Sequence, residues 1–109
     1  MSLDRDTKYL NDILKECENI ETFTKGIKDW VQLRDDKKTG YAVVRSITII
    51  GEAAKKLSQT KRDSNPEVPW SLIMGMRDRL VHDYGGVDYE IVWNVIKEEI
   101  PNLVHILKK

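Results

Sequence analysis

Apolar side chains recur every three or four positions along most of this chain, and polar stretches that contain Gly or Pro separate the runs. Such spacing puts the apolar residues on one face of a helix, whereas a half-buried strand needs strict alternation. The first run predicts a helix from about Asp4 to Ile20. Its apolar members are Tyr9, Leu10, Ile13, Leu14, Cys17 and Ile20. The pattern limits the chain mainly to helical architectures.

Two further helices are predicted before the middle of the chain. Thr22 or Thr24 can cap a short helix that carries Trp30 and Val31, because a threonine hydroxyl accepts hydrogen bonds from the free N–H groups of a first turn. The polar residues 35–40 form a connection or the start of a long helix over about residues 43–57. The β-branched residues of this segment are also compatible with a buried strand, but the three-four spacing favours a helix.

The second half of the chain predicts a loop and two more helices. Residues 59–69 contain Ser, Asn and two prolines, a composition typical of a loop. A helix then begins near Trp70 and ends by Gly85-Gly86, because paired glycines stop helices. Asp88 caps a fifth helix, which Pro101 either kinks or restarts. We therefore expect an all-α, up-down bundle of about five helices.

Length and composition predict a small cytoplasmic domain. The chain of 109 residues suits one domain over residues 1–109, with 40% hydrophobic and 33% charged residues. No apolar run is long enough to span a membrane, no signal peptide precedes the domain, and the single Cys17 excludes an internal disulfide. The 18 basic and 18 acidic residues cancel, which argues against a protein that coats nucleic acid through bulk charge. A function on nucleic acid therefore needs a local site.

One segment gathers the side chains with the most chemistry, Arg77-Asp78-Arg79-Leu80-Val81-His82-Asp83-Tyr84. Arg77 can bind a phosphate through two hydrogen bonds and keeps its charge at any pH. Histidine titrates near neutrality, so His82 can take or give a proton. Tyr84 can position the histidine or contact the phosphate. The set suits cleavage of RNA, whose 2′-hydroxyl is a built-in nucleophile, so that no metal is required, and the sequence contains no obvious set of metal ligands.

A single ideal helix cannot aim these three side chains at one point. At about 100° per residue, Arg77 and Tyr84 lie about 20° apart around a helix, whereas His82 lies about 140° from Arg77. Either the helix ends near His82 and the chain turns, or two copies of the segment face each other across a two-fold axis. The two arrangements are compatible with each other. The second predicts a homodimer in which two chains build one cleft.

Each of these residues also has an ordinary structural explanation. Arg77 can form an ion pair with Glu52 or Asp78, and His82 can lie at a helix C-terminus, where the dipole favours its positive form. Tyr84 can be a core aromatic residue. Glu52 is either a structural partner of Arg77 or Arg45, or a solvated side chain. The spacing of an arginine and a histidine by itself is common, so it does not establish a site.

The segment from Arg77 to Tyr84 resembles the Arg-x4-His-x-Tyr motif of HEPN domains, specifically of the HepT-like toxins. Residues 41–57 resemble the long central helix of that family. Val68-Pro69-Trp70 and residues 88–101 resemble its flanking helices. The resemblance covers most of the chain in order, and it implies a helical bundle that pairs as a two-fold homodimer.

The resemblance also implies an activity. Members of the family are metal-independent endoribonucleases that need no cofactor and leave a 2′,3′-cyclic phosphate, and the Arg and His of both protomers line a cleft. These catalytic roles carry over to Arg77 and His82. Many members are toxins of type VII toxin–antitoxin systems, neutralised by a minimal nucleotidyltransferase antitoxin. In some pairs the antitoxin transfers AMP groups to the motif tyrosine, which here is Tyr84.

Asp78 departs from the family pattern, which often has Asn after the motif arginine. An ionised aspartate only accepts hydrogen bonds, so Asp78 is expected to weaken phosphate binding at Arg77 or to orient that side chain. Together with the zero net charge, this leaves a second hypothesis, a non-catalytic subunit that binds a nucleotide or the transferase. A third hypothesis is a helical adaptor without a site.

Overall fold

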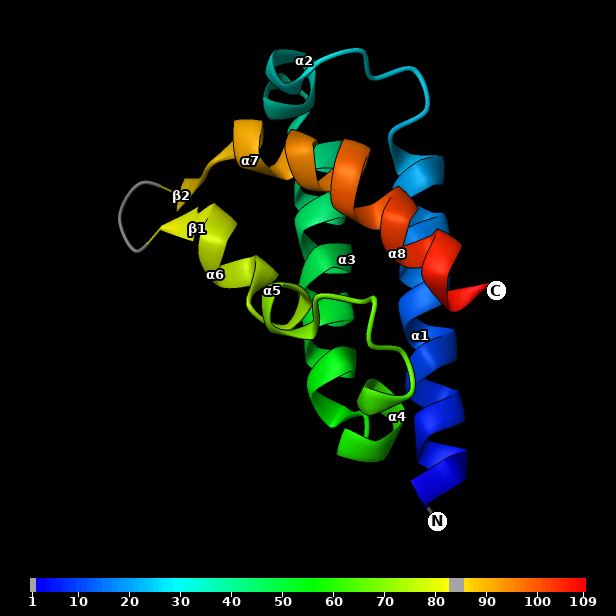
Figure 1. Ribbon diagram of the computed structural model, residues 1–109. Helices are drawn as coiled ribbons and strands as arrows, with labels where there is room; N and C mark the ends of the chain where they lie inside the picture. The colour runs from blue at the N-terminus through cyan, green and yellow to red at the C-terminus, as the bar shows by residue number, and fades with distance from the viewer. Residues whose placement is uncertain (1, 83–85) are drawn as a thin grey trace.

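A computed structural model describes residues 2–82 and 86–109 and shows helices gathered around one long helix, α3 (Lys37–Lys56). The helix α1 (Ser2–Phe23) lies antiparallel beside α3 along most of its length (Figure 1). On the other side of α3 lie α5 (Trp70–Met74) and α6 (Met76–Leu80). The all-α prediction is confirmed, although the described chain divides into more helices than the five predicted.

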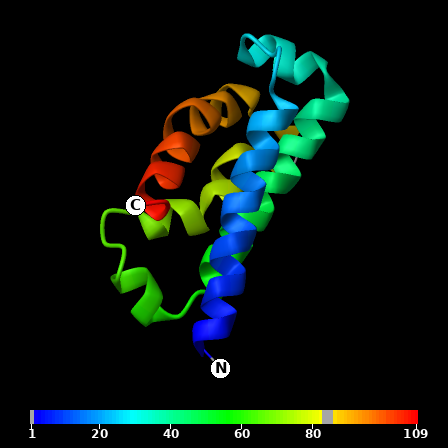
Figure 2. The same ribbon diagram turned by 90° about the vertical axis from the view of Figure 1, so that its right-hand side faces the viewer.

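The C-terminal helices run as one nearly continuous segment across this arrangement (Figure 2). Within it, α7 (Tyr89–Asn94) packs against α2 (Trp30–Asp35) and α6, and α8 (Ile100–Leu107) packs against α1. The remaining elements are α4 (Gln59–Asp63), β1 (Val81–His82), β2 (Gly86–Val87) and the π-helix η1 (Val95–Glu99). No helix in the part of the chain that the structure describes is long and apolar enough to cross a membrane.

The core consists mostly of the apolar faces that the sequence pattern predicted. The exception is α2, which buries Leu33 and leaves Val31 38% exposed. The fully buried side chains of the core include Ile13, Ile20, Leu33, Ile47, Ile50, Ile73, Met76, Leu80, Val92 and Leu103. Cys17 lies in the same core with 3% exposure, and burial raises the pKa of its thiol to about 12. Because the thiolate is the reactive form of cysteine, this residue acts as a small apolar side chain.

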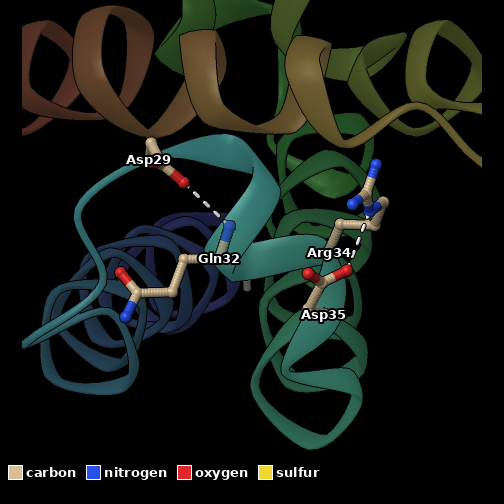
Figure 3. Close-up of polar contacts among 4 residues, drawn as sticks. All are labelled: Asp29, Gln32, Arg34 and Asp35. Atoms are coloured by element: carbon tan, nitrogen blue, oxygen red, sulfur yellow. Dashed lines mark hydrogen bonds and ion pairs between the residues drawn. The ribbon is translucent and has the colours of Figure 1, made fainter.

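The second helix begins later than predicted. Thr24 does not cap it, because its Oγ1 donates to the Ile20 carbonyl at the end of α1, at 2.8 Å. The cap is Asp29, whose carboxylate accepts a hydrogen bond from the Gln32 N–H at 2.8 Å (Figure 3). Aspartate ranks above threonine as an N-cap, so α2 starts at Trp30.

The long central helix confirms the helical prediction for its β-branched segment and excludes the strand. It begins within the polar segment 35–40, because the Asp36 carboxylate accepts a hydrogen bond from the Thr39 N–H at 3.1 Å. Gly51 on this helix faces the backbone of α5, and a Cβ atom at this position would lie 3.3 Å from the Ile73 carbonyl oxygen. Because Gly51 has no Cβ atom, α5 can approach α3 closely at this position.

The predicted loop over residues 59–69 is wrong at its start, where Gln59–Asp63 forms α4. Ser58 caps this helix by accepting from the Lys61 N–H at 3.0 Å. Arg62 Nη1 then donates to the carbonyl oxygens of Ala54 at 3.1 Å and Leu57 at 3.0 Å. These bonds reach carbonyl groups at the end of α3, of which that of Ala54 also accepts from the Leu57 N–H at 3.3 Å. They stabilise a helix whose sequence alone is typical of a loop.

Asp6 joins the start of α1 to the start of α4 across the bottom of the molecule. Its Oδ2 accepts from the Ser58 hydroxyl at 2.7 Å and its Oδ1 accepts from the Ser58 N–H at 2.8 Å. Only 5% of the residue is exposed. The hydroxyl bond, followed by the backbone bond, holds the pKa of Asp6 below its ordinary value.

This depressed pKa predicts an acid-sensitive contribution to stability. Because the pKa of Asp6 is lower in the folded state, its contribution is complete above the unfolded pKa of about 3.9 and is lost as the pH falls through the folded value. Replacing Asp6 with asparagine should therefore destabilise the protein at neutral pH, and the difference from wild type should shrink on acidification. Urea unfolding at a series of pH values measures this. A difference that stays constant down to about pH 3 would contradict the role of the ionised carboxylate.

Candidate functional site

The segment that carries the candidate residues is not one helix. It breaks at Gly75 between α5 and α6, and α6 ends at Leu80, before the limit that Gly85-Gly86 was predicted to set. Val81 adopts an extended conformation with φ −111° and ψ 124°. The Leu80 carbonyl then accepts a hydrogen bond from the Asp88 N–H at 2.8 Å, so a contact made after the turn stops the helix.

A short antiparallel hairpin replaces the predicted end of the helix. Val81 pairs with Val87, and His82 pairs with Gly86. Gly86 has φ +74°, a left-handed conformation that glycine adopts at little cost. The structure thus shows the first of the two alternatives, a helix that ends near His82. His82 therefore lies outside the helix, whose geometry would have pointed its side chain about 140° away from that of Arg77.

Arg77 presents a largely free guanidinium group on α6. Its side chain is 57% exposed, and its contact with a carboxylate is 3.5 Å long, from Nη1 to Asp78 Oδ1. Ion pairs between exposed side chains contribute little, about 0–1 kcal/mol. The guanidinium group can therefore exchange this contact for a phosphate at small cost. Asp78 provides this contact, and its effect on phosphate binding stays a prediction.

A pocket of about 230 Å³ opens beside Arg77, between α3 and α6. It is lined by Thr48, Gly51, Glu52, Lys55, Met74, Arg77 and Asp78. Glu52 is exposed at this pocket and forms no hydrogen bond or ion pair with any described residue, so the predicted pairing with Arg77 is absent here. Two cationic and two anionic side chains thus meet at one small cavity, and neither carboxylate closes tightly on Arg77.

His82 is exposed on β1, and its imidazole forms no hydrogen bond within residues 2–82 and 86–109. It does not line the pocket beside Arg77. The structure therefore places Arg77, Asp78 and Glu52 together and puts His82 on the adjoining hairpin. Tyr84, the third predicted site residue, lies outside the described residues. Within those residues, no group of three or more His, Cys, Asp or Glu side chains is arranged to hold a metal ion.

One residue of the motif has a partner that sequence analysis missed. Arg79 Nη2 and Nη1 donate to Glu99 Oε1 at 2.7 Å and Oε2 at 3.0 Å. This hydrogen bonding, more than any other effect, raises the pKa of Arg79 above its ordinary value. Nothing in the local pattern marks the pair, because its members lie 20 residues apart on different helices.

Comparison with known proteins assigns the chain to a family. A sequence model described as "Ribonuclease HepT-like" matches residues 13–109, which includes α3, the motif helix and the C-terminal helices. The chain belongs to the HepT-like ribonuclease family. The predicted resemblance is thereby confirmed.

Individual relatives of this HepT-like chain agree with the family match. A protein of Thermococcus cleftensis, named a probable ribonuclease HepT, is 44% identical over 97 residues, which cover 87% of this chain and 86% of the relative. A protein of Caldanaerobacter subterraneus, named as a candidate RNase, is 46% identical over 103 residues, which cover 93% and 89%. A third, from Methanocaldococcus jannaschii and also named as a candidate RNase, is 39% identical over 100 residues, which cover 91% of each chain. No solved structure matches the chain.

Proposed function

We propose that this HepT-like ribonuclease is a metal-independent endoribonuclease in which Arg77 binds the scissile phosphate and His82 moves the proton. The observation that carries the proposal is the free guanidinium of Arg77 at the wall of a pocket, with an exposed histidine on the hairpin that follows the same short helix. The family and the names of the relatives support a ribonuclease. The division of roles rests on the chemistry of the two side chains.

The proposed reaction is a transesterification within the RNA. His82 takes the proton of the 2′-hydroxyl, the 2′-oxygen forms a bond to the adjacent phosphorus, and the bond from phosphorus to the 5′-oxygen breaks. The departing 5′-oxygen gains a proton, and the products are a 2′,3′-cyclic phosphate and a 5′-hydroxyl. Arg77 stabilises the charge that develops on the non-bridging oxygens, and Lys55 adds a second cation at the same pocket.

We also infer that the active species is a two-fold homodimer. Leu72, on the helix directly before the motif helix, is 49% exposed, and Tyr41 on α3 is 67% exposed. A second copy of the chain that packs on these side chains would bury their apolar surface. A second copy covering them supports a cleft in which Arg77 and His82 of both chains face the same RNA.

The wider assignment is a toxin of a type VII toxin–antitoxin pair in the cytoplasm, with a minimal nucleotidyltransferase as antitoxin. Its support is the motif itself and the family to which the chain belongs. Tyr84 is then the residue to which the antitoxin transfers AMP. Mass spectrometry of the protein co-expressed with its neighbouring transferase tests this, because AMP adds a defined mass to a single peptide.

The activity is tested by incubating purified protein with RNA in the presence of a chelator and analysing the fragment ends by mass spectrometry. We expect cleavage with 2′,3′-cyclic phosphate and 5′-hydroxyl ends. Cleavage that disappears in the chelator contradicts the metal-independent mechanism. A protein that binds nucleotides but leaves RNA intact supports the non-catalytic subunit instead.

Replacing Asp78 with asparagine should raise the activity. The substitution removes the carboxylate that contacts Arg77 at 3.5 Å and restores the residue that the family often has at this position. Because the pair is exposed, we expect a gain of only about two- to fivefold in kcat/KM for RNA. The replacement of Asp35, which also follows an arginine, provides the matched control (Figure 3). An unchanged rate would show that Asp78 does not compete with RNA, and a lower rate would show that it orients Arg77.

A further inference from the structure

The motif helix α6 carries two arginines that point in different directions. Residues two positions apart lie about 200° apart around a helix, so Arg79 faces away from Arg77. The Arg77 side chain is 57% exposed and the Arg79 side chain 34% exposed. Arg79 engages both carboxylate oxygens of Glu99, at 2.7 and 3.0 Å. Its Nε is buried and has no acceptor among the described residues, so the ion pair with Glu99 is what holds this guanidinium.

An irregular helical turn determines the direction of the Glu99 side chain. It is the last residue of the π-helix η1, in which the Ile100 N–H donates to the Val95 carbonyl, five residues back. Pro101 explains the irregularity, because it has no N–H and its ring collides with the carbonyl four residues earlier in a regular helix. One extra residue in a turn rotates the neighbouring side chains by about 100°. The proline therefore determines which side chain the segment presents to α6.

Contacts with α3, α7 and the hairpin orient α6, and its Leu80 carbonyl accepts a hydrogen bond from the Asp88 N–H at 2.8 Å. The helix has five residues, and Gly75 at its start provides no side-chain cap. Met76 and Leu80 are fully buried on one side of the helix, which directs that face into the core. The pair between Arg79 and Glu99 supplies a directional contact on another helix. Because Arg77 precedes Arg79 by two positions and His82 follows it by three, any rotation of α6 moves both proposed catalytic side chains.

We propose that Arg79 and Glu99 are positioning residues of the ribonuclease site, which hold α6 and the start of the hairpin at the rotation that aims Arg77 and His82 at one RNA phosphate. The inference rests on the proposed function. Neither residue needs to touch RNA. A displacement of about 1 Å in a catalytic group can reduce a rate by about 100-fold, so the effect appears in kcat more than in binding.

The test compares Glu99→Gln and Arg79→Lys with wild type in RNA cleavage. Gln keeps the size of Glu99 without its charge, and Lys keeps the charge of Arg79 without its two-pronged geometry. We expect kcat to fall about 10- to 100-fold, with KM changed less than about threefold. The reversed pair, Arg79→Glu with Glu99→Arg, should recover part of the loss. Glu67→Gln, which removes an exposed carboxylate paired with Lys109, is the charge control and should retain the wild-type rate.

Two further measurements separate positioning from a general loss of stability. Ile106→Val in the core of α8 supplies a variant of lower Tm with an intact ion pair. Equal losses of kcat in this variant and in Glu99→Gln, measured below both Tm values, would overturn the proposal. NMR signals of the Arg77 side chain and the His82 imidazole should shift in Glu99→Gln and stay in place in Glu67→Gln.

The outcomes also separate this inference from the proposed function. An active wild type with an equally active Glu99→Gln variant overturns the positioning role alone. A wild type that does not cleave RNA overturns the ribonuclease, and the NMR comparison then decides whether Glu99 orients Arg77 and His82. Unshifted signals in Glu99→Gln overturn the positioning role in either case.

Discussion

RNA cleavage should fall about 100- to 10,000-fold when His82 is replaced by alanine, the range expected on removal of a general acid–base group. His82 is exposed on β1, and its imidazole has no hydrogen-bond partner in the described chain, so its loss leaves the core intact. The change should therefore appear in kcat without a change in Tm. The assay is initial-rate cleavage of a labelled RNA, with unfolding followed in parallel.

The sequence offers a matched control for this variant. His105, the second of the two histidines, is exposed on α8. Its replacement by alanine should leave the rate at the wild-type value. Cleavage that survives in His82→Ala, or that is lost equally in His105→Ala, would show that His82 does not move the proton.

Replacing Arg77 with alanine should reduce kcat/KM by about 100- to 1000-fold, as when one group that stabilises a developing oxyanion is removed. Lysine at this position should recover only part of the activity, because it keeps the charge but cannot form two parallel bonds to a phosphate. The exposed side chain and its long contact with Asp78 predict that neither change alters folding. Single-turnover cleavage at several RNA concentrations separates the effects on binding and on chemistry.

Arg34 provides a control with the same local chemistry. It lies on α2 and contacts the carboxylate of the next residue, Asp35, at 2.9 Å (Figure 3). Arg34→Ala thus removes an exposed arginine with an adjacent aspartate at a distance from the motif. Equal losses in Arg34→Ala and Arg77→Ala would indicate a general effect of positive charge on RNA binding and would remove the specific role of Arg77.

Local periodicity was sufficient to predict most helices of this HepT-like chain. The core faces of the long helices are visible as three-four spacing, and the Asp88 cap follows from one residue, since its carboxylate accepts from the Ile91 N–H at 3.2 Å. Pro101 was predicted to kink or restart the last helix, and α8 begins at Ile100 with the proline in its first turn. The end of the helix near His82 was one of two alternatives that the angular separation of Arg77 and His82 suggested, the other being a cleft built by two chains, and the roles of both residues stay predictions.

The features that sequence analysis missed depend on contacts between distant segments. The helix α4 forms because Arg62 reaches carbonyl groups at the end of α3 and Asp6 binds Ser58 from a position 52 residues earlier. The hairpin that frees His82 depends on pairing with residues after the turn. The pair between Arg79 and Glu99 requires both the motif helix and the π turn. No spacing rule within one segment contains this information.

The central claim is that the 2′-hydroxyl of RNA is the nucleophile at a site built from Arg77 and His82. The most direct measurement uses two otherwise identical RNA oligonucleotides, one with a single 2′-deoxy sugar at the mapped cleavage position, both in the presence of a chelator. We predict that the ribose substrate is cut there and leaves a 2′,3′-cyclic phosphate, whereas the deoxy substrate stays intact at that position. Equal cleavage of both substrates at that position would contradict the account.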